Sequence, residues 1–191
     1  MLEDESWLVT KKNELAQFNQ AILDIDWSRL LTLSNTVVKS LRRGNRIAFV
    51  GNGGSAAEAM HLAAEFTSKC VINHVPLNAL CLNESQSAIT AIGNDFGFDL
   101  IFSRLVEAHL TEGDILITLS TSGKSNNILS AIDVAKKLKI ETLLWTGNHK
   151  VNIEGIDVWN CDLSSTPRIQ EIHLIWGHLL AELVEQEFQI T

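Results

Sequence analysis

The feature that most constrains the fold is a regular alternation of short apolar runs with segments of helical periodicity. The first apolar run, RIAFV (46–50), leads directly into GNGGSAAEAMHLAAEF (51–66), where a glycine-rich turn precedes a helix-like pattern. Further apolar runs occupy residues 77–82, 114–120, 141–147 and 156–162. Strands that alternate with helices usually pair in parallel through right-handed crossovers. The sequence therefore predicts a three-layer α/β/α sandwich of the Rossmann-like type around one parallel sheet.

Helical segments fill the intervals between these runs. Apolar side chains recur at helical spacing over 7–41 and are interrupted at 24–27, which predicts two helices before the first strand, the second ending at Gly44. Further helices are expected over 55–69, from Ser85 onward, and over 98–110, 126–138 and 166–187. Ser55 has the residue type of a helix N-cap. The length of 191 residues favours a single domain over 1–191, which includes the N-terminal helical segment 1–44.

The charge balance limits the classes of partner. A formal net charge of -8 produces a field that repels phosphate backbones and anionic lipids, so we expect no direct contact with nucleic acid or membrane. The compact basic cluster of residues 39–46 is typical of a solvated helix C-terminus, where cations face the negative end of the dipole.

Three widely spaced cysteines, Cys70, Cys81 and Cys161, favour buried thiols in a reducing compartment. The acidic start MLEDESWLV does not have the charge pattern of a signal peptide, and no run approaches the roughly 20 apolar residues of a membrane span. We therefore expect a cytoplasmic protein.

The turn GNGGS can be interpreted in three ways. Gly51-x-Gly53-x-x-Ala56 superficially fits the dinucleotide-binding fingerprint, but the acidic residue expected about 20 positions later is missing at 70–72. A tight strand-to-helix turn without a ligand is the second possibility. We favour the third, an anion or sugar-phosphate site, because glycines let backbone N–H groups approach an oxyanion at a helix N-terminus.

A second polar turn strengthens the anion hypothesis. The segment Ser120-Thr121-Ser122-Gly123-Lys124-Ser125 follows another expected strand and precedes another expected helix. Taken alone, such a turn most often only caps its helix. The carboxyl ends of parallel strands lie at one edge of a sheet, so the two turns are expected to meet there around one ligand.

The helix after GNGGS places His61 and Glu65 four residues apart, so both side chains face the same way. Such a pair is usually a surface hydrogen bond, but this helix is largely apolar, and a buried carboxylate needs a metal, a proton or another partner. The final helix, in RIQEIHLIWGHLLAE, supplies four more candidates, Gln170, His173, His178 and Glu182. Periodicity alone does not determine which of these turn inward.

These segments together resemble the sugar-isomerase (SIS) domain family and, within it, the phosphoheptose isomerases. The matching stretches are GNGGSAAEAMHLAAEF, AIGNDFGFDLIFSRLVEA, GDILITLSTSGKSN and RIQEIHLIWGHLLAELVE, collinear over residues 51–187. The resemblance implies an aldose–ketose isomerase that converts sedoheptulose 7-phosphate to D-glycero-D-manno-heptose 7-phosphate through an enediol, in bacterial heptose biosynthesis. It also implies a homotetramer whose active sites lie between subunits.

The resemblance implies residue roles as well. Glu65 would be the catalytic base and His178 the acid. One Zn ion per subunit would be held by His61, Glu65, Gln170 and His178. The sugar-phosphate substrate would be bound by Asn52, Gly53, Gly54, Ser55, Asn94, Asp95, Ser120, Thr121, Ser122, Ser125 and Gln170.

A related branch on the same fold provides the alternative function, a non-catalytic SIS tetramer that binds the DnaA replication initiator. Those proteins lack an acidic residue at position 65 and a histidine at position 178, whereas this chain has both. The chain also departs from the isomerase pattern at Lys69, at Asn148-His149-Lys150 and at Pro167. These departures bear on substrate fit and leave the type of reaction unaffected.

Overall fold

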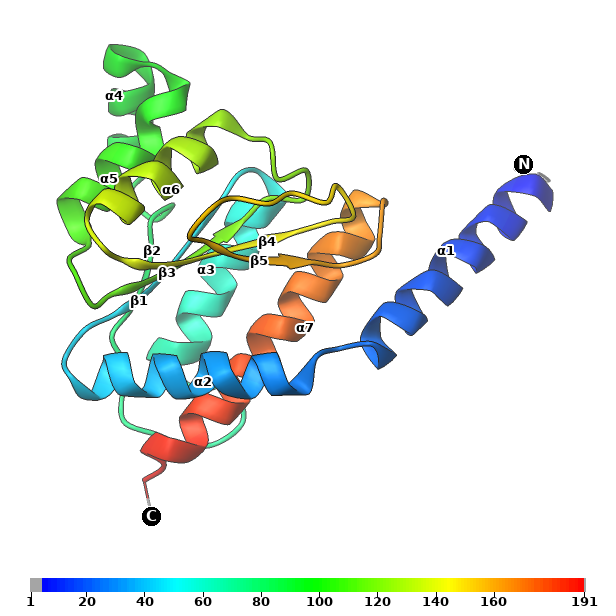
Figure 1. Ribbon diagram of the computed structural model, residues 1–191, viewed down its shortest axis with the longest axis horizontal. Helices are drawn as coiled ribbons and strands as arrows, with labels where there is room; N and C mark the ends of the chain where they lie inside the picture. The colour runs from blue at the N-terminus through cyan, green and yellow to red at the C-terminus, as the bar shows by residue number, and fades with distance from the viewer. Residues whose placement is uncertain (1–4, 191) are drawn as a thin grey trace.

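The computed structural model describes residues 5–190, which fold around one five-stranded sheet whose strands all run parallel (Figure 1). The strands are β1 Ile47–Gly51, β2 Ala79–Cys81, β3 Ile115–Leu119, β4 Glu141–Thr146 and β5 Asp157–Asn160, in the spatial order β2-β1-β3-β4-β5. The helices are α1 Glu5–Leu23, α2 Trp27–Arg42, α3 Gly54–Thr67, α4 Gln86–Phe96, α5 Ile101–His109, α6 Asn126–Lys137 and α7 Thr166–Glu185, with two 3-10 turns, η1 Phe98–Leu100 and η2 Gln186–Phe188. The predicted parallel α/β architecture is confirmed.

The direction in which the sheet grows reverses at β1. The chain passes from β1 to β2 on one side and then to β3 on the other, where Ile47 aligns with Ile115 and Gly51 with Leu119. In open parallel sheets a ligand crevice forms outside the carboxyl ends of the strands at such a switch point. The loops that follow β1 and β3, which carry the two polar turns, flank this position.

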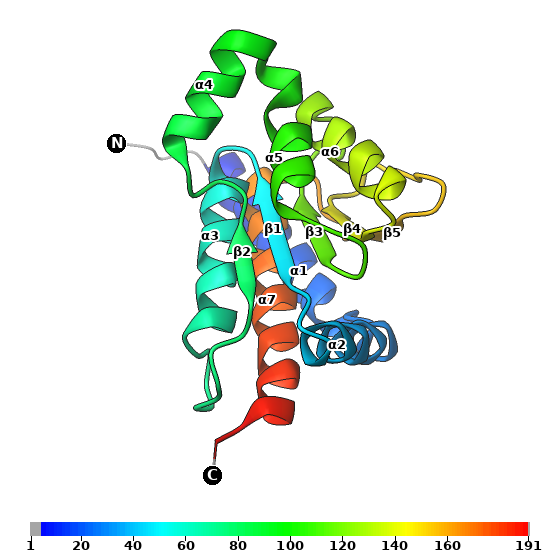
Figure 2. The same ribbon diagram turned by 90° about the vertical axis from the view of Figure 1, so that its left-hand side faces the viewer.

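Alternate strand residues serve two different helical layers. Phe49 and Trp145 belong to the core that includes residues of α2, α3 and α7, whereas Val50 and Leu144 belong to the core with α5 and α6. Figure 2 shows α3 and α7 side by side on one face of the sheet and α5 with α6 on the other. The predicted three layers are therefore present.

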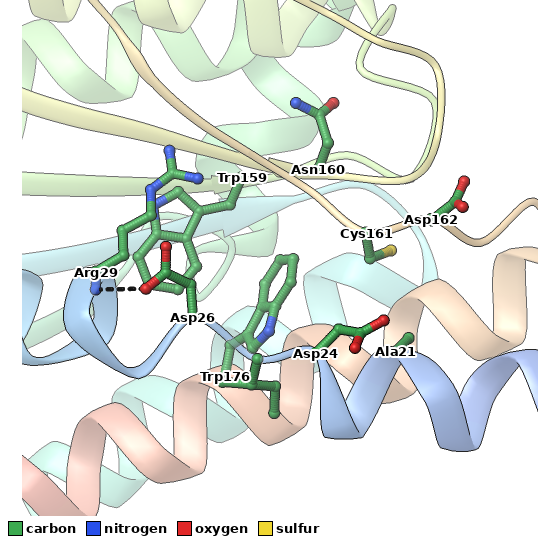
Figure 3. A pocket seen from close by; sticks show the side chains of 10 residues that line it. Ala21, Asp24, Asp26, Arg29, Trp159, Asn160, Cys161, Asp162 and Trp176 are labelled. Carbon is green, nitrogen blue, oxygen red and sulfur yellow. Dashed lines mark hydrogen bonds between the residues drawn. The ribbon is translucent and has the colours of Figure 1, made fainter.

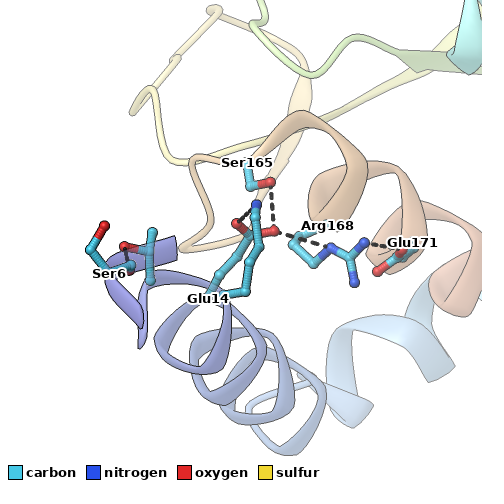
Figure 4. Close-up of polar contacts among 7 residues, drawn as sticks. Ser6, Glu14, Ser165, Arg168 and Glu171 are labelled. Atoms are coloured by element: carbon cyan, nitrogen blue, oxygen red, sulfur yellow. Dashed lines mark hydrogen bonds and ion pairs between the residues drawn. The ribbon is translucent and has the colours of Figure 1, made fainter. Parts of the chain in front are cut away.

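Helix α1 extends away from these layers, and none of its residues is buried (Figure 1). It is attached to the start of α7 through Glu14, which accepts a hydrogen bond from Ser165 at 3.0 Å and pairs with Arg168 at 3.4 Å (Figure 4). Arg168 also pairs with Glu171 at 2.8 Å and lies 5.7 Å from the Phe18 ring. This polar network, together with the packing of Phe18, Ala21 and Ile22 against the core, holds α1 beside α7.

The ends of α2 match the capping residues in the sequence, whereas the start of α3 does not. Asp26 caps α2 by accepting a hydrogen bond from the Arg29 N–H at 3.0 Å, and α2 ends just before Gly44, whose φ is +85°. Ser55 was predicted to cap α3, and this was wrong. The cap is Gly53, and Ser55 is buried inside the first helical turn because the glycine turn is tight enough for the helix to begin at Gly54.

Strand β2 is shorter than the sequence predicted. The expected strand over 77–82 contracts to three residues, because only Ala79–Cys81 pair with β1. Within residues 5–190, no helix combines the length and the apolarity needed to cross a membrane.

Candidate active site

Two glycines, Gly53 and Gly54, shape the turn after β1. Gly53 has φ +54° and ψ -119°, a conformation that side chains disfavour. A Cβ on Gly54 would collide with the Gln170 side-chain amide of α7. The turn therefore brings the start of α3 against the start of α7, and it places Gln170 at the carboxyl edge of the sheet.

Asparagine side chains hold this turn to its neighbours. Asn52 and Asn127 exchange two hydrogen bonds of 2.8 and 2.9 Å, and Asn127, in the first turn of α6, is 1% exposed. Asn83, just after β2, donates to the Gly51 carbonyl at 2.9 Å and accepts from the Gly51 N–H at 3.2 Å. The Asn52–Asn127 pair spans the switch point between β1 and β3, so it fixes the spacing of the two polar turns.

In the second turn, residues 120–125, some hydroxyl groups are already engaged in hydrogen bonds within the turn. Ser120 is buried, its hydroxyl accepts from the Gly123 N–H at 3.1 Å, and it lies 3.3 Å from the Ser125 hydroxyl. Ser122 accepts from the Lys124 N–H at 3.2 Å. Ser125 occupies the cap position of α6 but makes no side-chain cap bond to the part of α6 that the structure describes. The Ser125 hydroxyl is thus the member of this turn best placed to serve a ligand.

Farther along α3 and α7, three of the predicted metal-ligand side chains meet. His61 Nε2 lies 2.8 Å from His178 Nε2 and 3.4 Å from Glu65 Oε1, and the two imidazole rings meet edge to face. One ligand atom from each of the three residues lies within 4.8 Å of the others. Two imidazoles and a carboxylate at this spacing form a donor set that suits zinc.

Gln170, the fourth predicted ligand, lies nearer the strand ends. It lines the same open cavity as His61, of about 520 Å³, whose walls are Gly54, Ala57, Glu58, His61, Pro167, Gln170, Glu171 and Leu174. Gln170 precedes His178 by eight residues on α7, which corresponds to about 12 Å of helical rise. The cavity therefore connects the turn after β1 with the metal-type cluster, and the role of Gln170 as a ligand stays a prediction.

Asn94 and Asp95 are not gathered into either turn. Both are exposed in the last part of α4, where the Asn94 amide donates to Asp95 at 2.8 Å. Helix α4 projects from the body of the molecule and has no buried residue (Figures 1 and 2). Their role in substrate binding stays a prediction.

The sequence interpretation missed Glu58 and left His173 unassigned, yet both lie at the centre of this region. Glu58 is 5% and His173 0% exposed, and Glu58 Oε1 faces His173 Nδ1 at 3.6 Å. Burial raises the pKa of Glu58 to about 7, although the Ser55 hydroxyl opposes the rise. Burial also lowers the pKa of His173 to about 3, against the effect of the nearby Thr146 backbone. Glu58 precedes His61 by three residues, a spacing that marks one helix face.

A second cavity, of about 220 Å³, lies between the α1–α2 connection, the end of β5 and α7, and holds none of the predicted site residues (Figure 3). The Trp159 and Trp176 rings form part of its wall, and Asp24 and Asp162 lie at its side. Asp26 is engaged as the cap of α2, and Arg29 is paired with Asp157.

Comparisons of sequence agree with this arrangement. A family model described as SIS domain matches residues 12–147. A phosphoheptose isomerase from Rhodospirillum rubrum is 44% identical over 158 residues, which cover 80% of this chain and 82% of that protein. A probable phosphoheptose isomerase from Thermoplasma acidophilum is 34% identical and is covered over 98% of its length, against 93% of this chain.

Solved structures agree as well. Phosphoheptose isomerase GmhA from Neisseria gonorrhoeae matches with a TM-score of 0.83 at 30% identity, covering 95% of this chain and 98% of that one. A phosphoheptose isomerase from Francisella tularensis matches with a TM-score of 0.85 at 26% identity, covering 97% of this chain and 100% of that one. The parallel sheet, its two polar turns and these matches establish that the chain belongs to the SIS-domain family. Within that family it belongs with the phosphoheptose isomerases, and the resemblance found in the sequence is confirmed.

Proposed function

We propose that the protein is a sugar-phosphate isomerase that interconverts sedoheptulose 7-phosphate and D-glycero-D-manno-heptose 7-phosphate in cytoplasmic heptose biosynthesis. The observation that carries this proposal is the meeting of α3 and α7 at His61, Glu65 and His178, beside an open cavity that reaches the strand-end turns. A non-catalytic relative that binds a replication initiator has no need for a carboxylate and an imidazole at these positions.

The reaction moves a proton between C1 and C2 and needs a second transfer between the two oxygens. Glu65, whose side chain is 17% exposed, takes the carbon-bound proton and returns it to the neighbouring carbon. His178 moves the proton between the oxygens. The cavity is open, so the sugar enters along α3 and α7 with its reacting end at the cluster.

His61, Glu65 and His178 would hold a zinc ion, with Gln170 as a fourth ligand. Zinc, when bound, would polarise the substrate carbonyl and stabilise the negative charge of the enediolate. The donor set supports this ligand because the two Nε2 atoms already converge at 2.8 Å. Gln170 lies about two helical turns before His178 on its own chain, which favours a site completed by a neighbouring chain.

The phosphate binds between the two polar turns at the switch point. Backbone N–H groups at the starts of α3 and α6 would donate hydrogen bonds to a phosphate bound there. The half-buried Ser125 and Thr121 hydroxyls can add further hydrogen bonds. Asn52 is already engaged with Asn127, so its contribution is mainly to shape the turn.

The assembly is a homotetramer. Helix α1 and the start of α2 expose several large apolar side chains: Trp7, Leu8, Val9, Leu15, Leu23, Trp27 and Leu31. Leu30, next to Leu31 on α2, is fully buried within the chain and is not part of this surface. Apolar surface on a projecting helix is typical of contacts between subunits.

One assay tests the proposed function. The zinc-loaded protein is incubated with sedoheptulose 7-phosphate, and an aldose heptose phosphate is followed by chromatography. We expect conversion. Absence of turnover together with binding to a replication initiator would favour the alternative function, and light scattering at the monomer mass of 21.2 kDa would contradict the tetramer.

A further inference from the structure

The contact between α3 and α7 is unusually close at both of its ends. Near the strand ends the Gln170 side chain rests against Gly54, and two turns farther a side chain at Gly177 would collide with Leu62. Next to Gly177, His178 reaches His61. Close helix packing without a directional contact leaves the axial position of one helix against the other poorly determined.

The centre of this contact holds a buried polar pair. Glu58 of α3 and His173 of α7 lie between the Gly54–Gln170 contact and the His61–His178 contact in the order of both helices. Within residues 5–190, several buried side-chain nitrogen and oxygen atoms have no hydrogen-bond partner. Most of them belong to Glu58, His173 and the adjacent Trp145. Polar groups buried in this way reduce stability, so their presence calls for another explanation.

The two side chains are chemically matched. Near neutral pH, Glu58 retains a hydrogen to donate in part of the molecules and His173 is neutral, with a lone pair that can accept it. At 3.6 Å, Glu58 Oε1 and His173 Nδ1 stand about 0.5 Å beyond hydrogen-bond distance. A small side-chain shift would bring these atoms into a hydrogen bond, and a buried polar contact of that kind can fix the register of packed helices.

We propose that Glu58 and His173 are positioning residues that fix the register of α3 against α7, so that His61 and His178 meet. An axial slip by one residue would move one histidine by about 1.5 Å relative to the other. That movement would alter both the metal-binding geometry and the placement of Glu65. The proposal deepens the proposed isomerase function and rests on it for the activity readout alone.

The first experiment compares Glu58→Met with Glu58→Gln. Methionine fills the space of the glutamate without polar atoms, so thermal stability is expected to be retained or raised, while kcat falls about 10-fold and Co²⁺ affinity falls by a similar factor. Glutamine keeps an N–H donor for His173 Nδ1 and should retain kcat within about 3-fold. Ile172→Val, a matched buried control beside His173, should lower the melting temperature without changing kcat or Co²⁺ affinity.

The second experiment decides the matter if Glu58→Met does not fold. His173→Asn retains a polar group near the position of Nδ1, whereas His173→Gln retains one near Nε2, so the two variants share their chemistry and differ in reach. We expect His173→Asn to bind Co²⁺ at least about 5-fold more tightly and to turn over faster in proportion. Equal behaviour of these two variants, or wild-type kcat and Co²⁺ affinity in Glu58→Met, would overturn the proposal. Absence of turnover in the wild type would count against the isomerase function alone, because Co²⁺ binding still reports the register.

Discussion

The two halves of the site, the strand-end turns and the α3–α7 pair, are built on opposite principles. In the turns, polar side chains satisfy one another: Asn52 bonds to Asn127, and Asn83 to Gly51. On the helices, His61 and His178 meet at an open surface, and Glu58 and His173 lie buried without hydrogen bonds of ordinary geometry in the described chain. The chain itself preorganises the half that we propose binds the substrate, and it leaves polar groups unsatisfied in the half that we propose carries the reaction.

The largest expected effect is on the reactive half. Glu65→Gln and His178→Gln each remove one proton-transfer group, and each should lower kcat by at least about 10²-fold, the usual contribution of a general acid or base. Steady-state kinetics with sedoheptulose 7-phosphate measures the loss. Affinity for the substrate phosphate should change little, because the strand-end turns are untouched. Near-normal turnover in either variant would contradict the assigned roles.

The fold was predictable from the sequence because each element carries a local signal. Short apolar runs predicted strands such as 47–51 and 115–119, and Gly44 and the polar turns marked the boundaries between elements. Three of the four proposed metal ligands also converge as predicted. Contacts between distant segments were not predictable. Nothing local indicates that Asn127 pairs with Asn52 or that Glu58 faces His173, since both contacts arise only when helices pack. The predicted capping role of Ser55 was wrong because the tight glycine turn lets α3 begin at Gly54, with Gly53 as its cap.

The next largest expected effect is a pH dependence of folding stability that arises from the buried Glu58 in the reactive half. The folded-state pKa of Glu58, about 7, lies above the ordinary glutamate pKa of 4.5, so between these values the folded protein keeps a proton that the unfolded chain releases. Stability therefore falls as pH rises through this window, by an amount on the order of 3 kcal/mol at about 1.4 kcal/mol per pKa unit. Denaturant unfolding of wild type and Glu58→Gln should show a difference that grows from about pH 5 to about pH 7. Both proteins retain His173, so the difference between them reports chiefly the titration of Glu58. A difference that is independent of pH would contradict the buried state of Glu58.

A smaller effect separates ligand binding from helix capping in the second turn. Ser125→Ala removes a hydroxyl that makes no cap bond in the described part of α6 and only a long contact of 3.3 Å with the Ser120 hydroxyl, so the melting temperature should change little. If the hydroxyl binds the phosphate dianion, affinity for the sugar phosphate should fall about 10-fold, as expected for one hydrogen bond to a charged group. Calorimetric titration measures the affinity. A drop in melting temperature with unchanged affinity would show that the turn only caps its helix.

The smallest expected effect tests whether the strand-end half owes its rigidity to the asparagine pair. Asn127→Ala removes both hydrogen bonds to Asn52, each worth about 1 kcal/mol, but Asn52 is half-buried and can bond to water instead. The turn after β1 then loses its fixed distance from the turn after β3, so KM should rise about 5-fold while kcat stays within about 2-fold. The contrast with Glu65→Gln is direct, because that change lowers kcat and leaves the turns intact. A fall in kcat as large as the rise in KM would mean that the Asn52–Asn127 pair also positions the reacting end of the sugar. The two halves of the site would then not act independently.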